Sequence, residues 1–184
     1  MHAIAGLLRI TTISFALLVP LPLGSNTVDQ AQSSTIQQLS ARHVFDAKVA
    51  IGEMLNFGKS KYGERRIIPI TGGTFKGSGI EGLVLPGGAD WQLTRPDGDV
   101  ELYARYTLKT SDGFLIQVQN RVLMHIPRNE GKKEPYVRSV IDFEAPSASP
   151  YDWLNHAIFL GTLTVPPSIS KENPYVIVSV YQLQ

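Results

Sequence analysis

Apolar and polar residues alternate with a period of two along most of the chain. From Phe45 to Ile51 apolar side chains occupy every second position, and Asp46 and Lys48 stand between them. Side chains point alternately to the two faces of a β-strand, so this pattern predicts a strand with one buried face. Similar segments predict strands at residues 91–95, 100–109, 114–124, 136–143, 157–164 and 175–183. Helix signals are sparse, and only residues 152–155 are expected to form a single turn.

Glycine residues divide the stretch from residue 72 to residue 88 into short pieces. This stretch contains Gly72, Gly73, Gly77, Gly79, Gly82, Gly87 and Gly88. Glycines at such intervals favour short strands, bulges and tight bends, and they leave no room for a helix. Seven or more strands with regular turns in a chain of 184 residues predict a single all-β domain, either a barrel or a sandwich.

The N-terminal residues predict an export signal. Arg9 precedes a continuous apolar run at residues 10–24, and small and polar residues follow. This order is typical of a secretory signal peptide, and the run is shorter than the roughly 20 residues that span a bilayer. The alternative is a retained signal-anchor. We therefore expect a signal peptide at residues 1–25, a flexible segment at 26–41 and the β-domain at 42–184, in a secreted or periplasmic protein.

Composition narrows the classes of function. The chain has no cysteine, which excludes disulfides, thiolate metal sites and a cysteine nucleophile. Its formal net charge is +1, and loss of Arg9 with the signal leaves 16 basic and 16 acidic residues, so no global field attracts nucleic acid or anionic lipid. The histidines lack metal-ligand spacing, and phosphate-loop, dinucleotide and serine-hydrolase motifs are missing. The sequence predicts no metal, no cofactor, no nucleic-acid partner and no stable membrane insertion after signal cleavage, which leaves a small molecule as the expected partner.

Two Asp-Gly steps, at residues 97–98 and 112–113, predict β-hairpins and set a register. If each step forms a two-residue loop, Asp90 pairs with Arg105, and Arg105 pairs with Asn120. The shared face then includes Asp90, Gln92, Glu101, Tyr103, Arg105, Ile116, Val118, Asn120 and Val122. This mixture fits a barrel lumen that holds a partly polar ligand, and the alternative is a solvated face whose charges pair across strands. A loop one residue longer in either hairpin would swap the faces.

On the lumen interpretation these residues form a candidate site. Asp90 and Glu101 would move a proton as general acid or base, and Arg105 would stabilise a developing oxyanion. The predicted substrate-binding residues are Trp91, Gln92, Tyr103, Asn120, Trp153 and Asn155. Each has a plainer interpretation: Asp90 caps the glycine bend or forms a structural pair with Arg105, Glu101 faces solvent, and the tryptophans belong to the core. The basic cluster of Lys59, Lys61, Arg65 and Arg66 is expected to be solvated.

Several long motifs carry a resemblance to a known family. They lie at residues 65–77, 79–92, 101–108, 112–116 and 151–162. With these motifs the chain resembles uncharacterised protein family 0311, also called domain of unknown function 3237, from about residue 44 to residue 181. The resemblance implies a single compact β-barrel similar in outline to lipocalin-type barrels, and it implies no established reaction. Tyr103 and His156 depart from the family pattern, in which an acidic residue and an arginine are expected, and the signal peptide is an addition.

Two functions from different classes follow from the lumen interpretation. The first is a cofactor-free enzyme of isomerase, cyclase or dehydratase type, which transfers protons on a hydrophobic, oxygenated metabolite in secondary metabolism. The alternative is a non-catalytic exported carrier of a small metabolite. A structural or adhesion module of the cell envelope is a third interpretation.

Overall fold

The computed structural model describes residues 38–127, 134–166 and 172–184, which consist mainly of β-strands. The strands are β1 (Ala41–Ile51), β2 (Leu55–Ser60), β3 (Gly63–Gly77), β4 (Ile80–Val84), β5 (Gly88–Thr94), β6 (Val100–Thr110), β7 (Leu115–His125), β8 (Tyr136–Glu144), β9 (Phe159–Thr164) and β10 (Tyr175–Leu183). A short 3₁₀ helix, η1 (Asp152–His156), precedes β9. No helix in the described ranges has the length and apolar character needed to cross a membrane. The predicted signal peptide and most of the segment 26–41 lie outside the described residues.

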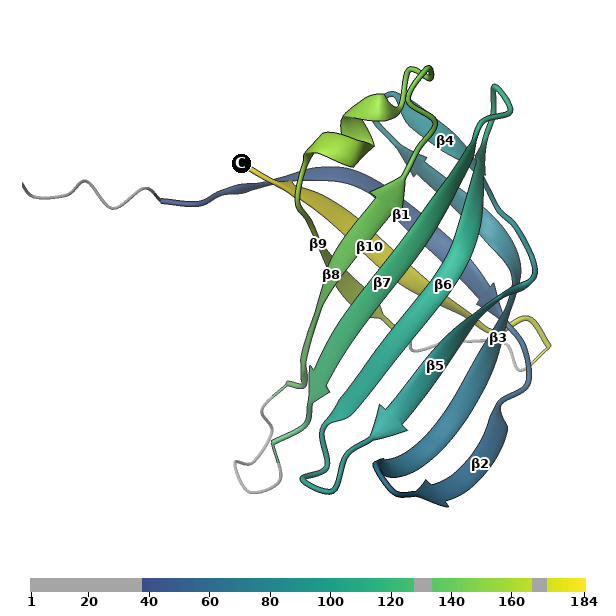
Figure 1. The fold of residues 1–184 in the computed structure, drawn as a ribbon, viewed down its shortest axis with the longest axis vertical. Helices are drawn as coiled ribbons and strands as arrows, with labels where there is room; N and C mark the ends of the chain where they lie inside the picture. The colour runs from purple at the N-terminus through teal and green to yellow at the C-terminus, as the bar shows by residue number, and fades with distance from the viewer. Residues whose placement is uncertain (1–37, 128–133, 167–171) are drawn as a thin grey trace, which may run out of the picture. The chain divides into compact units, whose positions relative to one another are not determined.

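The strands close into an eight-stranded antiparallel barrel, which confirms the predicted fold class (Figure 1). The hydrogen-bonded order is β1, β10, β9, β8, β7 and β6, and β3 pairs back with β1. The position between β6 and β3 is shared, because β4 pairs with one half of β3 and β5 with the other half. β2 forms a hairpin with β3 that extends one end of the barrel.

Strict alternation of side chains explains why β6 forms part of this wall. Every second residue of β6 is buried, and Glu101, Arg105 and Lys109 between them are exposed. The inward residues of β6 are Val100, Leu102, Ala104, Tyr106, Leu108 and Thr110. A period of two places all of them on the lumen side, where their burial stabilises the fold.

Aromatic side chains fill the end of the barrel next to η1. Phe45 contacts Phe75 and Phe143, and Phe143 lies edge-on to Phe159 with ring centroids 5.0 Å apart. Trp153 of η1 packs against the same Phe159 ring. Edge-to-face and tilted contacts of this kind are favourable beyond simple area burial. This end is therefore a packed core, and open space is left at the other end.

Both Asp-Gly hairpins differ from the prediction by one residue. Thr94 pairs with Val100, and Thr107 pairs with Gln117, so each loop holds three residues, 96–98 and 111–113. In each loop the glycine comes last and takes a positive φ, 93° for Gly98 and 97° for Gly113. A tight turn followed by one left-handed residue is the common three-residue hairpin loop. The predicted two-residue register is therefore wrong, and β6 presents its opposite face to the lumen.

Candidate functional site

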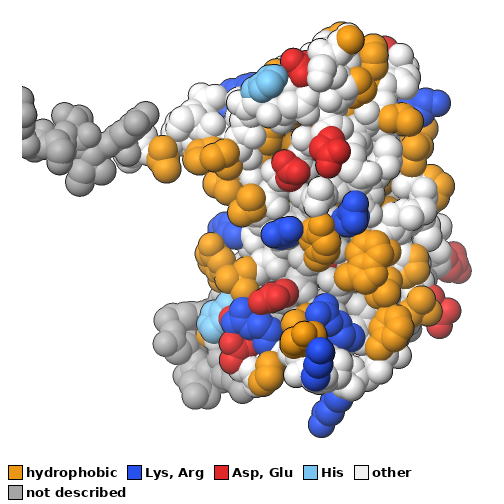
Figure 2. Space-filling model, viewed as in Figure 1, with side chains coloured by type: hydrophobic (Ala, Val, Ile, Leu, Met, Phe, Trp, Pro, Cys, Tyr) orange, Lys and Arg blue, Asp and Glu red, His pale blue; other side chains and the backbone are white. Residues whose placement is uncertain are grey.

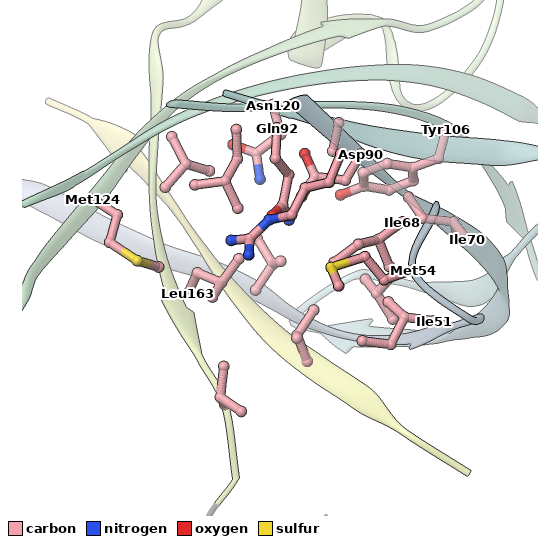
Figure 3. A pocket seen from close by; sticks show the side chains of 18 residues that line it. Ile51, Met54, Ile68, Ile70, Asp90, Gln92, Tyr106, Asn120, Met124 and Leu163 are labelled. Atoms are coloured by element: carbon pink, nitrogen blue, oxygen red, sulfur yellow. The ribbon is translucent and has the colours of Figure 1, made fainter. Parts of the chain in front are cut away.

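A cavity of about 280 Å³ opens at the end of the barrel away from η1 (Figure 3). Its lining is mainly apolar: Val49, Ile51, Met54, Ile68, Ile70, Leu102, Ala104, Tyr106, Val122, Met124, Leu163, Val165, Val176 and Val178. Four further lining residues are polar or charged, namely Arg66, Asp90, Gln92 and Asn120. An apolar hollow with a few convergent polar groups is the usual form of a small-molecule site.

Three polar side chains form a hydrogen-bonded chain on one wall of the cavity. Arg66 on β3 pairs with Gln92 on β5, and both point inward. The Arg66 Nε donates to Gln92 Oε1 at 2.5 Å, and Gln92 Nε2 donates to Asp90 Oδ2 at 2.6 Å. Because the guanidinium can only donate, it fixes the Gln92 amide with its nitrogen towards Asp90. Arg66 thereby positions the group that holds the carboxyl.

The carboxyl group of Asp90 has one bonded and one unbonded oxygen. Its Oδ1 is buried and accepts no hydrogen bond among the described residues, whereas Oδ2 is held by Gln92. Burial raises the pKa of Asp90 above its ordinary value, and the Gln92 bond, the Tyr103 backbone and the Arg66 charge only partly oppose this effect. Desolvation favours the neutral acid, and a proton on the unbonded Oδ1 would leave the Gln92 bond intact.

Two further polar groups lie near Asp90 on the neighbouring strands β6 and β7 of the same wall. Ala104 pairs with Asp90 on one side and with Asn120 on the other, so the two polar residues stand two strand spacings apart, about 10 Å between Cα atoms. The small side chain of Ala104 leaves the space between them open. Figure 3 shows the amide nitrogen of Asn120 and the Tyr106 hydroxyl on the cavity side. The buried Asn120 Oδ1 has no partner in the described part of the chain.

Three predicted site residues lie outside the barrel instead of in the lumen. Glu101 is exposed and pairs with Arg95 at 3.0 Å, and Tyr103 donates to Gln119 at 2.6 Å on the outer surface. Arg105 is exposed on the same surface, so the expected Asp90–Arg105 pair does not form. In Figure 2 this surface carries basic, acidic and hydrophobic side chains side by side. The shared face predicted for Asp90, Glu101 and Arg105 is wrong because the three-residue loops turn β6 over.

The tryptophans and Asn155 also lie away from the cavity lining. Trp91 points outward and keeps 40% of its surface exposed, while Trp153 packs at the aromatic end. Asn155 accepts from the Ala145 amide at 2.8 Å and donates to its carbonyl at 2.9 Å, so it ties η1 to the end of β8. Of the predicted residues, the structure brings Asp90, Gln92 and Asn120 together. The register error of one residue occurs in both hairpins, so it reverses β6 but leaves β5 and β7 in the predicted position relative to each other.

Sequence reasoning missed Arg66, which was expected to be solvated. Arg66, Ile68 and Ile70 line the cavity, whereas Arg65 faces outward beside Leu93. Apolar residues occur on both faces of β3, because Ile67 and Ile68 are adjacent in the sequence. The alternation of apolar and polar residues therefore could not decide which arginine points inward. The pairing of Arg66 with Gln92 on β5 is the feature that decides it, and it is visible only in the sheet. In the described part of the chain, no group of three or more His, Asp or Glu side chains is placed to hold a metal ion.

Comparison with known proteins assigns the family. The chain matches the family described as "Protein of unknown function (DUF3237)" over residues 39–183. It belongs to the DUF3237 family. A UPF0311 protein of Rhodopseudomonas palustris is 36% identical over 155 residues, which cover 79% of this chain and 97% of that protein. The crystal structure of the conserved protein of unknown function from this organism has a TM-score of 0.69 at 34% identity and covers 80% of this chain and 99% of its own.

Two other similar proteins add to this picture of the DUF3237 fold. A β-barrel-like protein of Acinetobacter baumannii has a TM-score of 0.69 at 31% identity, over 80% of this chain and 98% of its own. A hydroalkoxylation enzyme of Penicillium herquei is 28% identical over 130 residues, or 71% of this chain and 76% of the enzyme. This chain is thus similar, over 71% of its length, to a protein that has a named reaction.

Proposed function

We propose that this barrel is a cofactor-independent enzyme that transfers a proton to or from a hydrophobic, oxygenated small molecule. The observation that carries the proposal is the Asp90 carboxyl: it lines an apolar cavity, its pKa is raised by burial, and its Oδ1 has no partner in the described residues. A carboxylic acid that stays protonated nearer to neutral pH is suited to general acid catalysis. The distant relation to a hydroalkoxylation enzyme supports chemistry of this type.

The proposed reaction is the addition of a hydroxyl group across a carbon–carbon double bond within one substrate. Asp90 Oδ1 gives its proton to one alkene carbon, and the substrate oxygen forms a bond to the other carbon. The hydroxyl proton then returns to the Asp90 carboxylate, so the enzyme ends in its starting state. Gln92 keeps Oδ2 engaged throughout, which leaves Oδ1 as the proton-carrying oxygen. The apolar walls keep water away from the reacting carbons.

The first experiment identifies a substrate and then tests Asp90. Native mass spectrometry of the purified protein would reveal a co-purifying metabolite, and this compound or its unsaturated precursor is assayed for conversion. Asp90→Asn keeps the shape but cannot deliver a proton, so we expect turnover to fall by roughly a hundredfold or more while binding persists. Glu101→Gln is the matched control, because Glu101 lies outside the barrel, and its turnover should stay unchanged.

Two results would contradict the proposal. Full activity of Asp90→Asn would remove the proton donor. A ligand that binds in the cavity but is converted by no cognate reaction would identify the protein as a carrier instead.

We also propose that the barrel acts after export, as a secreted or periplasmic protein. The tripartite pattern of residues 1–25 supports this location. Expression of the full chain followed by cell fractionation and N-terminal sequencing tests it. A mature protein that starts near residue 26 outside the cytoplasm is expected, and an uncleaved cytoplasmic protein would contradict it.

A further inference from the structure

Arg66 places a positive charge in an apolar cavity without a carboxylate partner. Its Nε is bonded to the neutral Gln92 side chain, and no carboxylate of the described residues forms an ion pair with its guanidinium. Arg66 is half-buried, and most of the other side chains around it are apolar. A desolvated charge without a partner is costly, so such a group is normally matched by an opposite charge.

The other charged groups near Arg66 do not supply that opposite charge. Among the described lining residues, Asp90 supplies the carboxyl group; burial raises its pKa, and the Arg66 charge partly opposes this rise. Gln92 lies between the two side chains, which form no direct ion pair. Arg65 follows the opposite phase of β3, away from the cavity, where it pairs with Leu93 of β5. The hydrogen bond from the Arg66 guanidinium to Gln92 therefore goes to a neutral group, through Nε alone. The guanidinium still has two terminal nitrogens to offer, a geometry that suits an oxyanion.

We propose that the cavity selects ligands with an ionised oxygen, a phenolate or a carboxylate, on an apolar body, and that Arg66 binds this oxygen. The apolar walls would hold the body of the ligand, and the Asn120 amide nitrogen offers a further donor to a second oxygen. Selection for an anion distinguishes this site from an apolar pocket that takes neutral hydrocarbons or terpenes.

This selection deepens the proposed function and rests on it for its catalytic meaning. An oxygen held as an anion by Arg66 is already a nucleophile, so it can form the new C–O bond while Asp90 Oδ1 gives its proton to the neighbouring alkene carbon. An ionised substrate has no hydroxyl proton to return to Asp90, so the last proton transfer of the proposed cycle does not take place. The substrate enters with one negative charge, the product leaves neutral, and Asp90 remains as a carboxylate. The next proton comes from water, which restores the acid form. Arg66 would thus activate the oxygen, and Asp90 would supply the proton.

The test uses two fluorescent probes that differ in one sulfonate group. 8-Anilinonaphthalene-1-sulfonate is anionic, whereas N-phenyl-1-naphthylamine has the same ring system without the charge. We expect Arg66→Gln to weaken binding of the anionic probe by about tenfold or more and to leave the neutral probe nearly unchanged. Arg65→Gln is the matched control, since it removes an adjacent arginine from the outer face and should alter neither affinity. Arg66→Lys retains the charge and should retain part of the preference.

Competition with 4-nitrophenol and 4-nitrobenzoate identifies the kind of anion. A bound 4-nitrophenol that absorbs as the phenolate, at a pH just below its ionisation in water, would indicate a phenolate site; displacement by 4-nitrobenzoate alone would indicate a carboxylate site. Equal effects of Arg66→Gln on both probes, or no effect on either, would overturn the inference. If the protein prefers anions but catalyses no reaction, the inference stands and the proposed function is wrong. If Arg66→Gln retains full turnover, the proposed function stands and the inference is wrong.

Discussion

The environment of Asp90 disfavours the ionised form of its carboxyl group. One carboxyl oxygen is bound by Gln92, and the other is buried without a partner among the described residues. A carboxylate in this position reduces stability near neutral pH, because burial penalises the ionised form. Such a group is expected to be kept for its chemistry and not for the fold. Arg66, which positions Gln92, has the same character.

Asp90→Asn should therefore stabilise the protein near neutral pH. Burial raises the pKa of Asp90 above 3.8, so the folded protein retains this proton to a higher pH than the unfolded chain does. The wild-type protein should then lose stability relative to Asp90→Asn as the pH rises above about 4, and below that pH the difference should no longer depend on pH. Chemical denaturation of both proteins from pH 3 to pH 8 measures it. A wild-type protein that gains stability over this range relative to the variant would contradict the raised pKa.

Arg105→Ala should hardly change stability, by about 0.5 kcal/mol or less, because Arg105 is exposed and forms no pair with Asp90. Thermal melting of the variant gives the answer. A large loss would mean that Arg105 makes a buried contact after all.

At the scale of elements, the approach of β1 to β3 closes the barrel and depends on glycine. Gly73 of β3 has φ +139° and pairs with Val49, and a Cβ at this position would lie 2.0 Å from the Lys48 carbonyl oxygen. The clash involves backbone and cannot be relieved by a side-chain rotation. The glycines predicted short strands, bulges and tight bends, and three of them, Gly72, Gly73 and Gly77, lie within a strand of 15 residues.

Gly73→Ala should lower the free energy of unfolding by about 2 kcal/mol or more, because it adds a backbone clash to an unfavourable φ. Gly79→Ala is a matched control: Gly79 also has a positive φ, 79°, but a Cβ there meets nothing within 4 Å. Gly79→Ala should lower the free energy of unfolding by about 1 kcal/mol, because only the unfavourable φ contributes at this position. Urea denaturation of both variants compares them, and equal losses would show that strand contact at Gly73 is not limiting.

At the scale of the whole molecule, the barrel divides its interior between stability and binding. The aromatic cluster fills one end with buried rings, whereas the other end keeps a cavity of about 280 Å³. The apolar lining and Ala104 between Asp90 and Asn120 keep this space open. Substitutions in the cavity lining can therefore alter ligand binding without disturbing the aromatic core that stabilises the fold.

Ala104→Leu should block the cavity without unfolding the barrel. The larger side chain extends into an open cavity whose lining is mainly apolar, so the melting temperature should change little, while both fluorescent probes should bind at least about fivefold more weakly. Titration of the two probes measures this effect. Unaltered affinity for both probes would mean that they bind elsewhere on the protein.

The sequence by itself determined the all-β class, most strand positions and the placement of Asp90, Gln92 and Asn120 on one shared face. Alternation with a period of two is a local property of each strand, and β5 and β7 both show it. Once the inward face of one of these strands is known, the inward face of the other follows. The alternation of side chains left a barrel or a sandwich open, and the motifs shared with the DUF3237 family favoured the barrel. These features need no knowledge of which strand lies next to which.

Only the tertiary structure decided which face of β6 and which arginine of β3 point inward. One extra residue in the 96–98 and 111–113 loops turned β6 over and moved Glu101, Tyr103 and Arg105 outside. The side-chain period of a strand is two, so a register error of one residue reverses every position, and an Asp-Gly step is compatible with both loop lengths. Arg66 entered the site for the same reason: pairing with Gln92 across the sheet, and not the composition of its own strand, sets its direction.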